Sequence, residues 1–590
     1  MLFSEQRPVT IHRESGERGP ILDRNGRILA MESALANISL WKPEVSDLPA
    51  LCASLVAIPG LVDEDATDLA ERILSAPGDF MYLRKRVDQS LRDAVAHARA
   101  EGKLPGVGIE NIAARIYPEG ALASHVVGFV GDDNKGLGGV ELSFDRDLTA
   151  PEGERMGKQL FLTIDAEIQY RLESISRQTM KDNKAEAVMM MAMDSASGDI
   201  LAWVSLPDYD PNDIRSSSAD MRINRPSIWA YEPGSVFKIF SLAAILDLGG
   251  ITPHDSWYCD GTYSRSAPNG ETIGLSCLNR HGQVQLDQII AYSCNVGTAY
   301  ASDTVTSEAL YRVIRDFGFG SRTDIPLGGE SVGYLRPVDR WSLRSKPTIA
   351  IGQEIAVSAL QIMQAASAIA NEGILIRPRL VTKTLDATGT VTHSFPSEAR
   401  RQVISKETAQ TMLASLEHSL APGGIGRRAD IGDVRIGVKT GTAQLIDQTT
   451  GTYSKDDFIA SCIGFIPADE PQIIVYQVVV KPKSDSIFGS MIAAPAVKEA
   501  GSFLVDVLGI QRGRSVRVKH PGTIMLSGST VPRIGELLPD FTGLSKKQLL
   551  PLLARNDINV RIEGSGWVVR QNPEAGSPVS EGMDIILELE

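Results

Sequence analysis

The chain has 590 residues, of which 43% are hydrophobic and 22% charged, and its formal net charge is −14. This length exceeds what one hydrophobic core sustains, so we expect three or four domains. The acidic balance excludes nucleic acid as the main partner. No apolar run is long enough to predict a transmembrane helix, and the polar residues 1–15 do not resemble a signal peptide.

Residues 1–155 are predicted to form an extended N-terminal module of mixed structure. The stretch Arg18–Gly26 places a turn between two apolar runs, which is typical of a β-hairpin. Two further charged stretches, Arg115–Gly120 and Gly138–Glu141, are interpreted as turns or solvated charge clusters. No catalytic residue is predicted in this module.

The pattern changes near residue 162, and residues 156–510 are predicted to form one domain. The expected helices are 166–182, 307–318, 354–372, 406–420 and 489–508, and the expected strands are 187–193, 200–206, 434–442, 457–466 and 472–481. Residues 285–303 are expected to be helical with a break at 293–297, and residues 251–283 to be a loop-rich insertion. These elements predict a five-stranded antiparallel sheet with a helical lobe against it and a site at their seam.

The C-terminal part is predicted to be a small separate module, residues 531–590, behind a linker at 511–530. Ser545–Gln548 resembles a capping box that opens an amphipathic helix. Alternating strands are expected around 566–569, followed by a turn at 572–576. Pro551 falls inside the expected helix, where an interior proline costs about 3 kcal/mol.

The stretch Tyr231–Lys238 contains the single S-x-x-K of the chain, Ser235 and Lys238. An apolar run from Ile239 to Leu248 follows it and predicts a buried helix that ends at a glycine pair. Residues three apart share a helix face, so the amine of Lys238 is expected beside the Ser235 hydroxyl. An amine whose pKa is lowered by burial can take the serine proton.

One S-x-x-K is expected about once or twice by chance in a chain of this length. Here it is followed by a single S-x-N, Ser293-Cys294-Asn295, and then by a single K-T-G, at Lys439-Thr440-Gly441. These three motifs in this order are typical of penicillin-recognising serine acyltransferases. No C-x-x-C or H-E-x-x-H occurs, so neither a metal nor a cofactor is predicted.

With these motifs, the chain resembles class B penicillin-binding proteins over nearly all of its length. The segment from Glu232 to Lys238 resembles the division-type branch, and the motifs at Arg18, Arg115 and Glu141 resemble the pedestal domain of the family. Residues 531–590 resemble a PASTA domain, which is typical of division- and sporulation-specific members. The resemblance implies a multidomain α+β fold with helices on both faces of the transpeptidase sheet, an elongated pedestal and a small α/β PASTA domain.

The resemblance also implies D,D-transpeptidation of peptidoglycan stem peptides and inhibition by β-lactams. In that scheme Ser235 is the nucleophile and Lys238 its base. The remaining assignments are Ser293 as proton relay, Asn295 as the group that orients Lys238, Lys439, Thr440 and Thr442 as carboxylate binders, Gly441 as the residue that lets substrate approach, and the N–H groups of Ser235 and Thr442 as the oxyanion hole.

In sporulation-type relatives a cysteine pair in this region is redox-controlled. We therefore hypothesise a disulfide between Cys259 and Cys277 outside the cytoplasm, with two independent free cysteines as the alternative.

Family members carry one N-terminal membrane anchor, and we interpret its absence here as a trimmed or incorrectly assigned start. The implied location is the extracytoplasmic face of the bacterial membrane, and the implied partners are a separate glycosyltransferase and divisome proteins. Two rival functions are a β-lactamase and a wall-binding scaffold or sensor without turnover. The motifs are shared by septal and sporulation-specific members, so they imply either role.

Overall fold

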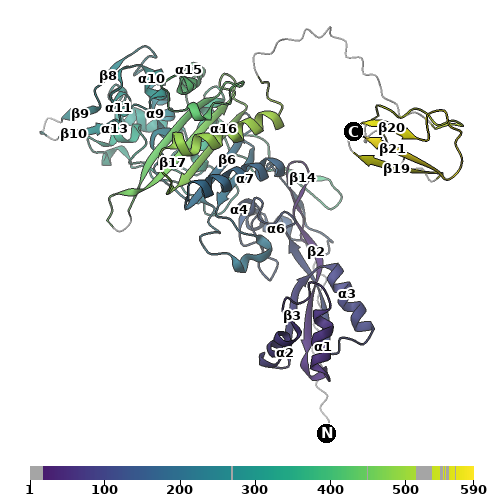
Figure 1. The fold of residues 1–590 in the computed structure, drawn as a ribbon. Helices are drawn as coiled ribbons and strands as arrows, with labels where there is room; N and C mark the ends of the chain where they lie inside the picture. Colours follow the sequence, from purple (N-terminus) through teal and green to yellow (C-terminus); the bar gives the residue numbers. More distant parts are fainter. Residues whose placement is uncertain are drawn as a thin grey trace. The chain divides into compact units, whose positions relative to one another are not determined.

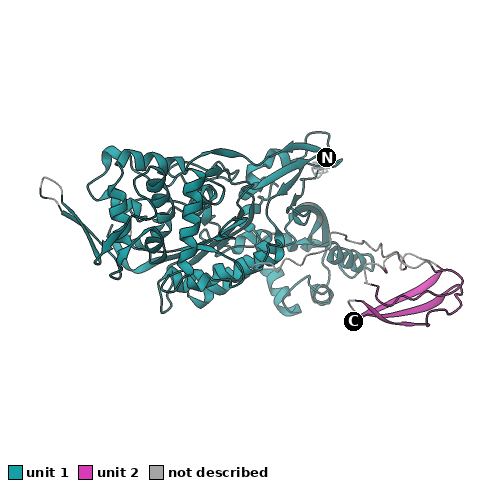
Figure 2. Cartoon of the chain, turned by 90° about the horizontal axis from the view of Figure 1, so that it is seen from above, with its two compact units in different colours: residues 1–513 teal, residues 514–590 magenta. Residues whose placement is uncertain are grey.

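The computed structural model describes residues 17–266, 270, 272–447, 450–512, 534–544, 549, 552, 557–564 and 567–589. The chain forms two compact units, residues 1–513 and 514–590, coloured separately in Figure 2. Within the described ranges no helix combines the length and apolarity that crossing a membrane needs.

The first unit is built around the predicted five-stranded antiparallel sheet (Figure 1). Its strand order is β16 (Gly437–Ile446), β17 (Tyr453–Ile466), β18 (Ile473–Val480), β6 (Ala187–Asp194) and β7 (Ile200–Leu206). All four pairings are antiparallel. The multidomain α+β class and this sheet are therefore confirmed.

Both faces of the sheet are buried, as alternate residues of β6 demonstrate. Met189, Met191 and Met193 belong to the core shared with the helical lobe. Met190 belongs to a second core, against α7 (Ala166–Asp182) and α16 (Gly489–Val507). Successive side chains of a strand point to opposite faces, so one apolar run supplies two cores.

The helical lobe covers the face opposite α7 and α16. Its helices are α9 (Lys238–Asp247), α10 (Leu286–Ala291), α11 (Asn295–Asp303), α12 (Ser307–Asp316), α13 (Ser345–Ala350), α14 (Ala359–Ala370) and α15 (Lys406–Glu417). The expected break between 285 and 303 separates α10 from α11.

The prediction of a helix from residue 354 is wrong at its start. Val357 exchanges two backbone hydrogen bonds with Tyr231, of 2.9 and 3.0 Å. The helix begins only after Ser358, whose hydroxyl accepts a hydrogen bond from the Gln361 N–H. This capping box ends the extended segment and starts α14.

The insertion at 251–283, predicted to be loop-rich, also contains short strands that were not predicted. Two small antiparallel pairs lie there: β8 (Trp257–Cys259) with β11 (Gly282–Val284), and β9 (Thr262–Ser266) with β10 (Thr272–Ser276). In the second pair Tyr263, Ile273 and Leu275 are buried between exposed neighbours. This period-two pattern is the strand signal that the sequence interpretation overlooked.

The N-terminal module contributes four strands to a seven-stranded sheet. They are β1 (Ile21–Leu22), β2 (Ile28–Trp41), β3 (Phe80–Val87) and β4 (Val107–Ile116); β5 (Gln159–Leu162), β13 (Val381–Leu385) and β14 (Val391–Ser394) complete it. The predicted hairpin is present as β1–β2. Helices α1 (Leu48–Val56), α2 (Ala66–Ser75) and α3 (Gln89–Ala100) pack beside β2 and β3.

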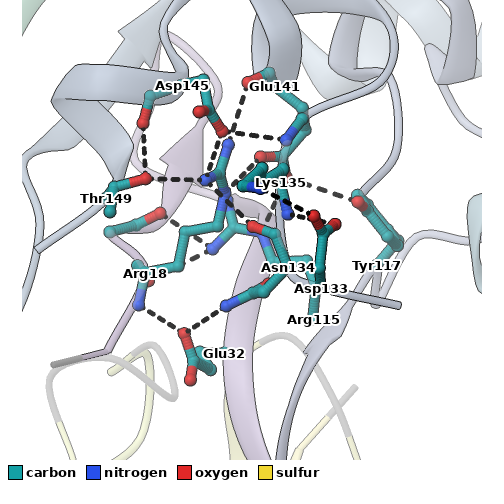
Figure 3. Close-up of polar contacts among 12 residues, drawn as sticks. Arg18, Glu32, Arg115, Tyr117, Asp133, Asn134, Lys135, Glu141, Asp145 and Thr149 are labelled. Atoms are coloured by element: carbon teal, nitrogen blue, oxygen red, sulfur yellow. Dashed lines mark hydrogen bonds and ion pairs between the residues drawn. The ribbon is translucent and has the colours of Figure 1, made fainter. Parts of the chain in front are cut away.

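The charged motifs of this module meet in one buried network (Figure 3). Glu141 accepts hydrogen bonds of 2.7 Å from both Arg18 and Arg115, and the side chains of all three are at most 2% exposed. Arg18 also pairs with Asp145 at 2.8 Å. The interpretation of these motifs as solvated clusters is therefore wrong, because sequence-distant opposite charges satisfy one another inside the fold.

The second unit contains β19 (Ile558–Gly564), β20 (Val568–Asn572) and β21 (Met583–Leu589). β21 lies in the middle, parallel to β19 and antiparallel to β20. Leu538, Phe541 and Leu587 are part of its core. The predicted capping box at 545–548, Pro551 and most of the predicted linker lie outside the described residues.

Candidate active site

Ser235 lies on a short 3-10 turn, η3 (Gly234–Phe237), immediately before α9. Gly234 has φ +56° and its N–H donates to the Gly352 carbonyl at 3.0 Å. A Cβ on Gly352 would lie 1.9 Å from the Gly234 carbonyl oxygen. Gly234, in the turn that carries Ser235, and Gly352, which packs against that turn, therefore both need to lack a side chain.

Lys238 is fully buried at the start of α9. Its Nζ donates to the Ser293 carbonyl at 2.6 Å, to the Ser293 Oγ at 3.3 Å and to the Asn295 Oδ1 at 2.7 Å. Burial lowers the pKa of Lys238 to about 8, the direction that its apolar surroundings predict. Among the described residues the Lys238 amine contacts Ser293 and Asn295 and not the Ser235 hydroxyl, so the expected contact between Lys238 and Ser235 stays a prediction.

Ser293 joins the two buried lysines. Its backbone has φ +54°, a conformation that costs a non-glycine residue about 1–3 kcal/mol. Its Oγ accepts a 2.9 Å hydrogen bond from Lys439 in addition to the one from Lys238. The pKa of Lys439 lies well below its ordinary value because of burial, and the neighbouring Lys238 lowers it further.

Asn295 is oriented by the strand β10. Its Nδ2 donates to the Ser276 carbonyl at 2.9 Å, which leaves Oδ1 to face Lys238. The two residues of the S-x-N motif thus hold the amine between them.

The residues after Lys439 lie on β16, the edge strand beside the Ser235 turn. A Cβ on Gly441 would lie 2.6 Å from the Ser461 Oγ and 3.1 Å from the Pro233 carbonyl oxygen. The Thr442 Oγ1 accepts a hydrogen bond from the Gly489 N–H at 3.1 Å. Gly441 therefore lets β16 pack on the turn that carries Ser235, whereas its predicted role in substrate approach stays a prediction.

A cleft of about 490 Å³ opens over these residues. Ser235, Ser293, Asn295, Thr440, Gly441 and Thr442 line it. Lys238 and Lys439 do not line the cleft: both are buried and contact Ser293, which does. The predicted motif residues therefore meet at the seam between sheet and helical lobe.

Further residues of the cleft wall were not predicted. Gln444 follows Thr442 by two positions on β16, so the period of a strand could have identified it. Phe458 pairs with Gln444 from β17. Tyr292 and Phe488 also line the cleft, and Phe488, which precedes α16, has no local sequence signal.

The five cysteines, all within the described residues, are free thiols. Cys277 lies nearest to Cys294, with 3.7 Å between the two sulfurs. Cys259 faces the Nδ1 of His281 at 3.5 Å. The disulfide between Cys259 and Cys277 stays a hypothesis. The sequence interpretation did not include Cys294 as a neighbour of Cys277.

Three family models match the chain. The penicillin-binding protein transpeptidase domain matches residues 188–500, the penicillin-binding protein dimerisation domain residues 13–160, and the PASTA domain residues 537–590. The domain limits of 1–155, 156–510, 511–530 and 531–590 stay predictions.

Individual relatives extend over most of the chain. Stage V sporulation protein D of Bacillus subtilis is 32% identical over 600 residues, covering 96% of this chain and 89% of that protein. The peptidoglycan D,D-transpeptidase FtsI of Escherichia coli K12 is 28% identical over 517 residues, covering 83% and 84%. The structure of penicillin-binding protein 3 of Mycobacterium tuberculosis with aztreonam superposes with a TM-score of 0.67, at 25% identity, covering 85% and 98%.

Proposed function

The chain belongs to the family of penicillin-binding protein transpeptidases, and from this premise we propose that Ser235 is its nucleophile in the cross-linking of peptidoglycan stem peptides. The protein is a serine D,D-transpeptidase that binds β-lactams. The observation that carries the residue assignment is the pair of buried amines, Lys238 and Lys439, on the single hydroxyl of Ser293.

In the first step the Ser235 Oγ attacks the carbonyl carbon of the penultimate D-alanine. An ester forms, the peptide C–N bond breaks and D-alanine leaves. Lys238 in its neutral form takes the serine proton, for which its lowered pKa is suited. Ser293, in contact with Lys238, gives its proton to the leaving nitrogen and takes one back from Lys238.

In the second step an amine from a neighbouring stem peptide attacks the ester carbonyl. A new amide bond forms, the ester C–O bond breaks and a proton from the attacking amine passes to the Ser235 Oγ. The N–H groups of Ser235 and Thr442 stabilise the oxyanion in both steps, each donor contributing about 3–4 kcal/mol. Lys439, Thr440 and Thr442 bind the terminal carboxylate, and Asn295 orients Lys238 and binds the substrate amide. A β-lactam mimics the D-Ala-D-Ala end and stays on Ser235.

The site of action follows from the substrate. Peptidoglycan lies outside the cytoplasmic membrane, so we infer that the protein works on the extracytoplasmic face, in septal or spore wall synthesis. A separate glycosyltransferase supplies the glycan strands, and divisome proteins are the expected partners.

Intact mass after incubation with a fluorescent penicillin tests the proposal. We expect a stable adduct on the wild-type chain and on Ser218→Ala, an exposed serine control, and none on Ser235→Ala. No adduct on folded wild-type protein would contradict the nucleophile assignment and favour the scaffold function. Rapid turnover of nitrocefin would instead favour the β-lactamase.

A further inference from the structure

Four side chains with metal-binding atoms gather beside the S-x-N motif. The sulfurs of Cys259, Cys277 and Cys294 and a ring nitrogen of His281 all lie within 4.8 Å of one another. Cys259 and Cys294 are fully buried. Cys277 and His281 lie four residues apart in the loop between β10 and β11, whereas Cys259 ends β8 and Cys294 caps α11.

Strand pairing brings the group together. Cys259 ends β8 opposite Gly282, the first residue of β11, so His281 lies beside it. Cys277 follows β10, and its N–H donates to the Gly261 carbonyl at 3.0 Å. Cys294 is the N-cap of α11. Four backbone positions are therefore fixed before any ion is bound.

The distances suit a tetrahedral ion. Zinc bonds of about 2.3 Å to sulfur and about 2.0–2.1 Å to nitrogen separate two sulfurs by about 3.8 Å, and a sulfur from a nitrogen by about 3.6 Å. The Cys277–Cys294 sulfurs are 3.7 Å apart, and the Cys259 sulfur is 3.5 Å from the His281 Nδ1. These two separations match two opposite edges of such a tetrahedron, and all four atoms lie within 4.8 Å of one another.

Backbone N–H groups point at two of the sulfurs. Cys277 accepts hydrogen bonds from the N–H of Asn295 at 3.1 Å and of Val296 at 3.3 Å, and Cys294 accepts one from Gly297 at 3.2 Å. Such donors favour a thiolate over a thiol, and thiolate is the form that binds metal.

We propose that Cys259, Cys277, His281 and Cys294 bind one zinc ion. Three soft sulfurs and one imidazole in tetrahedral positions are a donor set that zinc prefers. With four protein ligands no position remains for substrate or water, so the ion is structural and the thiols release their protons to solvent on binding.

The proposed zinc ion affects catalysis by holding Ser293 and Asn295 in place. Cys294 lies between Ser293 and Asn295, and both of these contact Lys238. A metal bond at Cys294 ties this strained segment to the β8–β11 pair. We expect the zinc-free chain to react with penicillin more slowly because Ser293 and Asn295 are then less firmly held.

The test measures metal in the full chain purified under reducing conditions with zinc present. We expect one equivalent of zinc by elemental analysis, and the visible absorption of a tetrahedral cobalt–thiolate site after exchange with Co²⁺. Cys259→Ala and His281→Ala should lose both signals. Cys52→Ala, a buried cysteine of the N-terminal module, should keep them.

Two results would overturn the site: a chain that takes up no zinc or cobalt in the reduced state, or metal retained after loss of both Cys259 and His281. The zinc measurement involves no penicillin, so its failure leaves the proposed function standing. Conversely, a chain that binds zinc but never forms an adduct would contradict only the proposed function.

Discussion

Two charged ammonium groups on one buried hydroxyl repel each other and lose their hydration, so the pair at Ser293 favours the neutral form of an amine. Lys238 and Lys439 both donate to its Oγ, and burial lowers the pKa of each. A neutral amine is the form that accepts a proton, so the arrangement supports the proposed role of Lys238 as a base.

The pKa of about 8 at Lys238 predicts the pH dependence of acylation. At pH 7 only about a tenth of the amine is neutral, and at pH 8 about half, so the acylation rate should rise about fivefold between them. Stopped-flow acylation by a fluorescent penicillin measures this. A rate that is flat, or that falls, from about pH 7 to pH 9 would contradict Lys238 as the base.

Replacing Ser293 tests the proton relay. Ser293→Ala removes the acceptor shared by both lysines, and we expect acylation to slow by about 100-fold or more, the usual contribution of a positioned proton-transfer group. The acylation rate is compared with that of Ser218→Ala, which should match the wild type. Unchanged acylation of Ser293→Ala would exclude the relay.

At the scale of elements, the strand β16 and the turn η3 must pack without a side chain between them. Gly441→Ala introduces a Cβ 2.6 Å from the Ser461 Oγ and 3.0 Å from the Val236 Cγ2. We expect a loss of about 1–3 kcal/mol in the free energy of unfolding, together with slower acylation, since the turn carries Ser235.

Gly328→Ala is the matched control, because its added Cβ has its nearest neighbour 3.9 Å away, at the Leu142 Cδ2. Denaturant unfolding and penicillin acylation of both variants are measured side by side. Equal stability and acylation rates of the two variants would show that the contact at Gly441 tolerates a methyl group.

Features that depend on neighbouring residues in the sequence were predicted, and features that depend on contacts between distant residues were not. The β6 methionines and the three single-copy motifs carry local patterns, and the five-stranded sheet and its cleft follow from them. Cys259 and His281 meet through the pairing of β8 with β11, and Cys294 joins them from the start of α11, so tertiary contacts and not local spacing assemble the group. Likewise, Glu141 meets Arg18 only through tertiary contact.

At the scale of the whole molecule, the buried network of the N-terminal module carries a stability prediction. Glu141→Gln leaves Arg18 and Arg115 buried without their shared carboxylate, and we expect a loss of about 3–5 kcal/mol in the free energy of unfolding. Glu119→Gln, in the exposed pair with Arg27, should cost about 1 kcal/mol or less.

Thermal unfolding of the two variants measures this difference, and acylation at low temperature checks that the folded site is intact. Similar unfolding midpoints for Glu141→Gln and Glu119→Gln would contradict a structural role of the buried network.

The seven-stranded sheet has a practical consequence for dissecting the protein. β1 is hydrogen-bonded to β5, which in turn pairs with β13, so a backbone ladder runs from the first described strand into the catalytic half of the chain. Cutting at residue 156 would strip β5 of a neighbour and expose an open edge, which is a template for aggregation. The same ladder provides a mechanical link, through which a pull on the N-terminal strands is transmitted to β13.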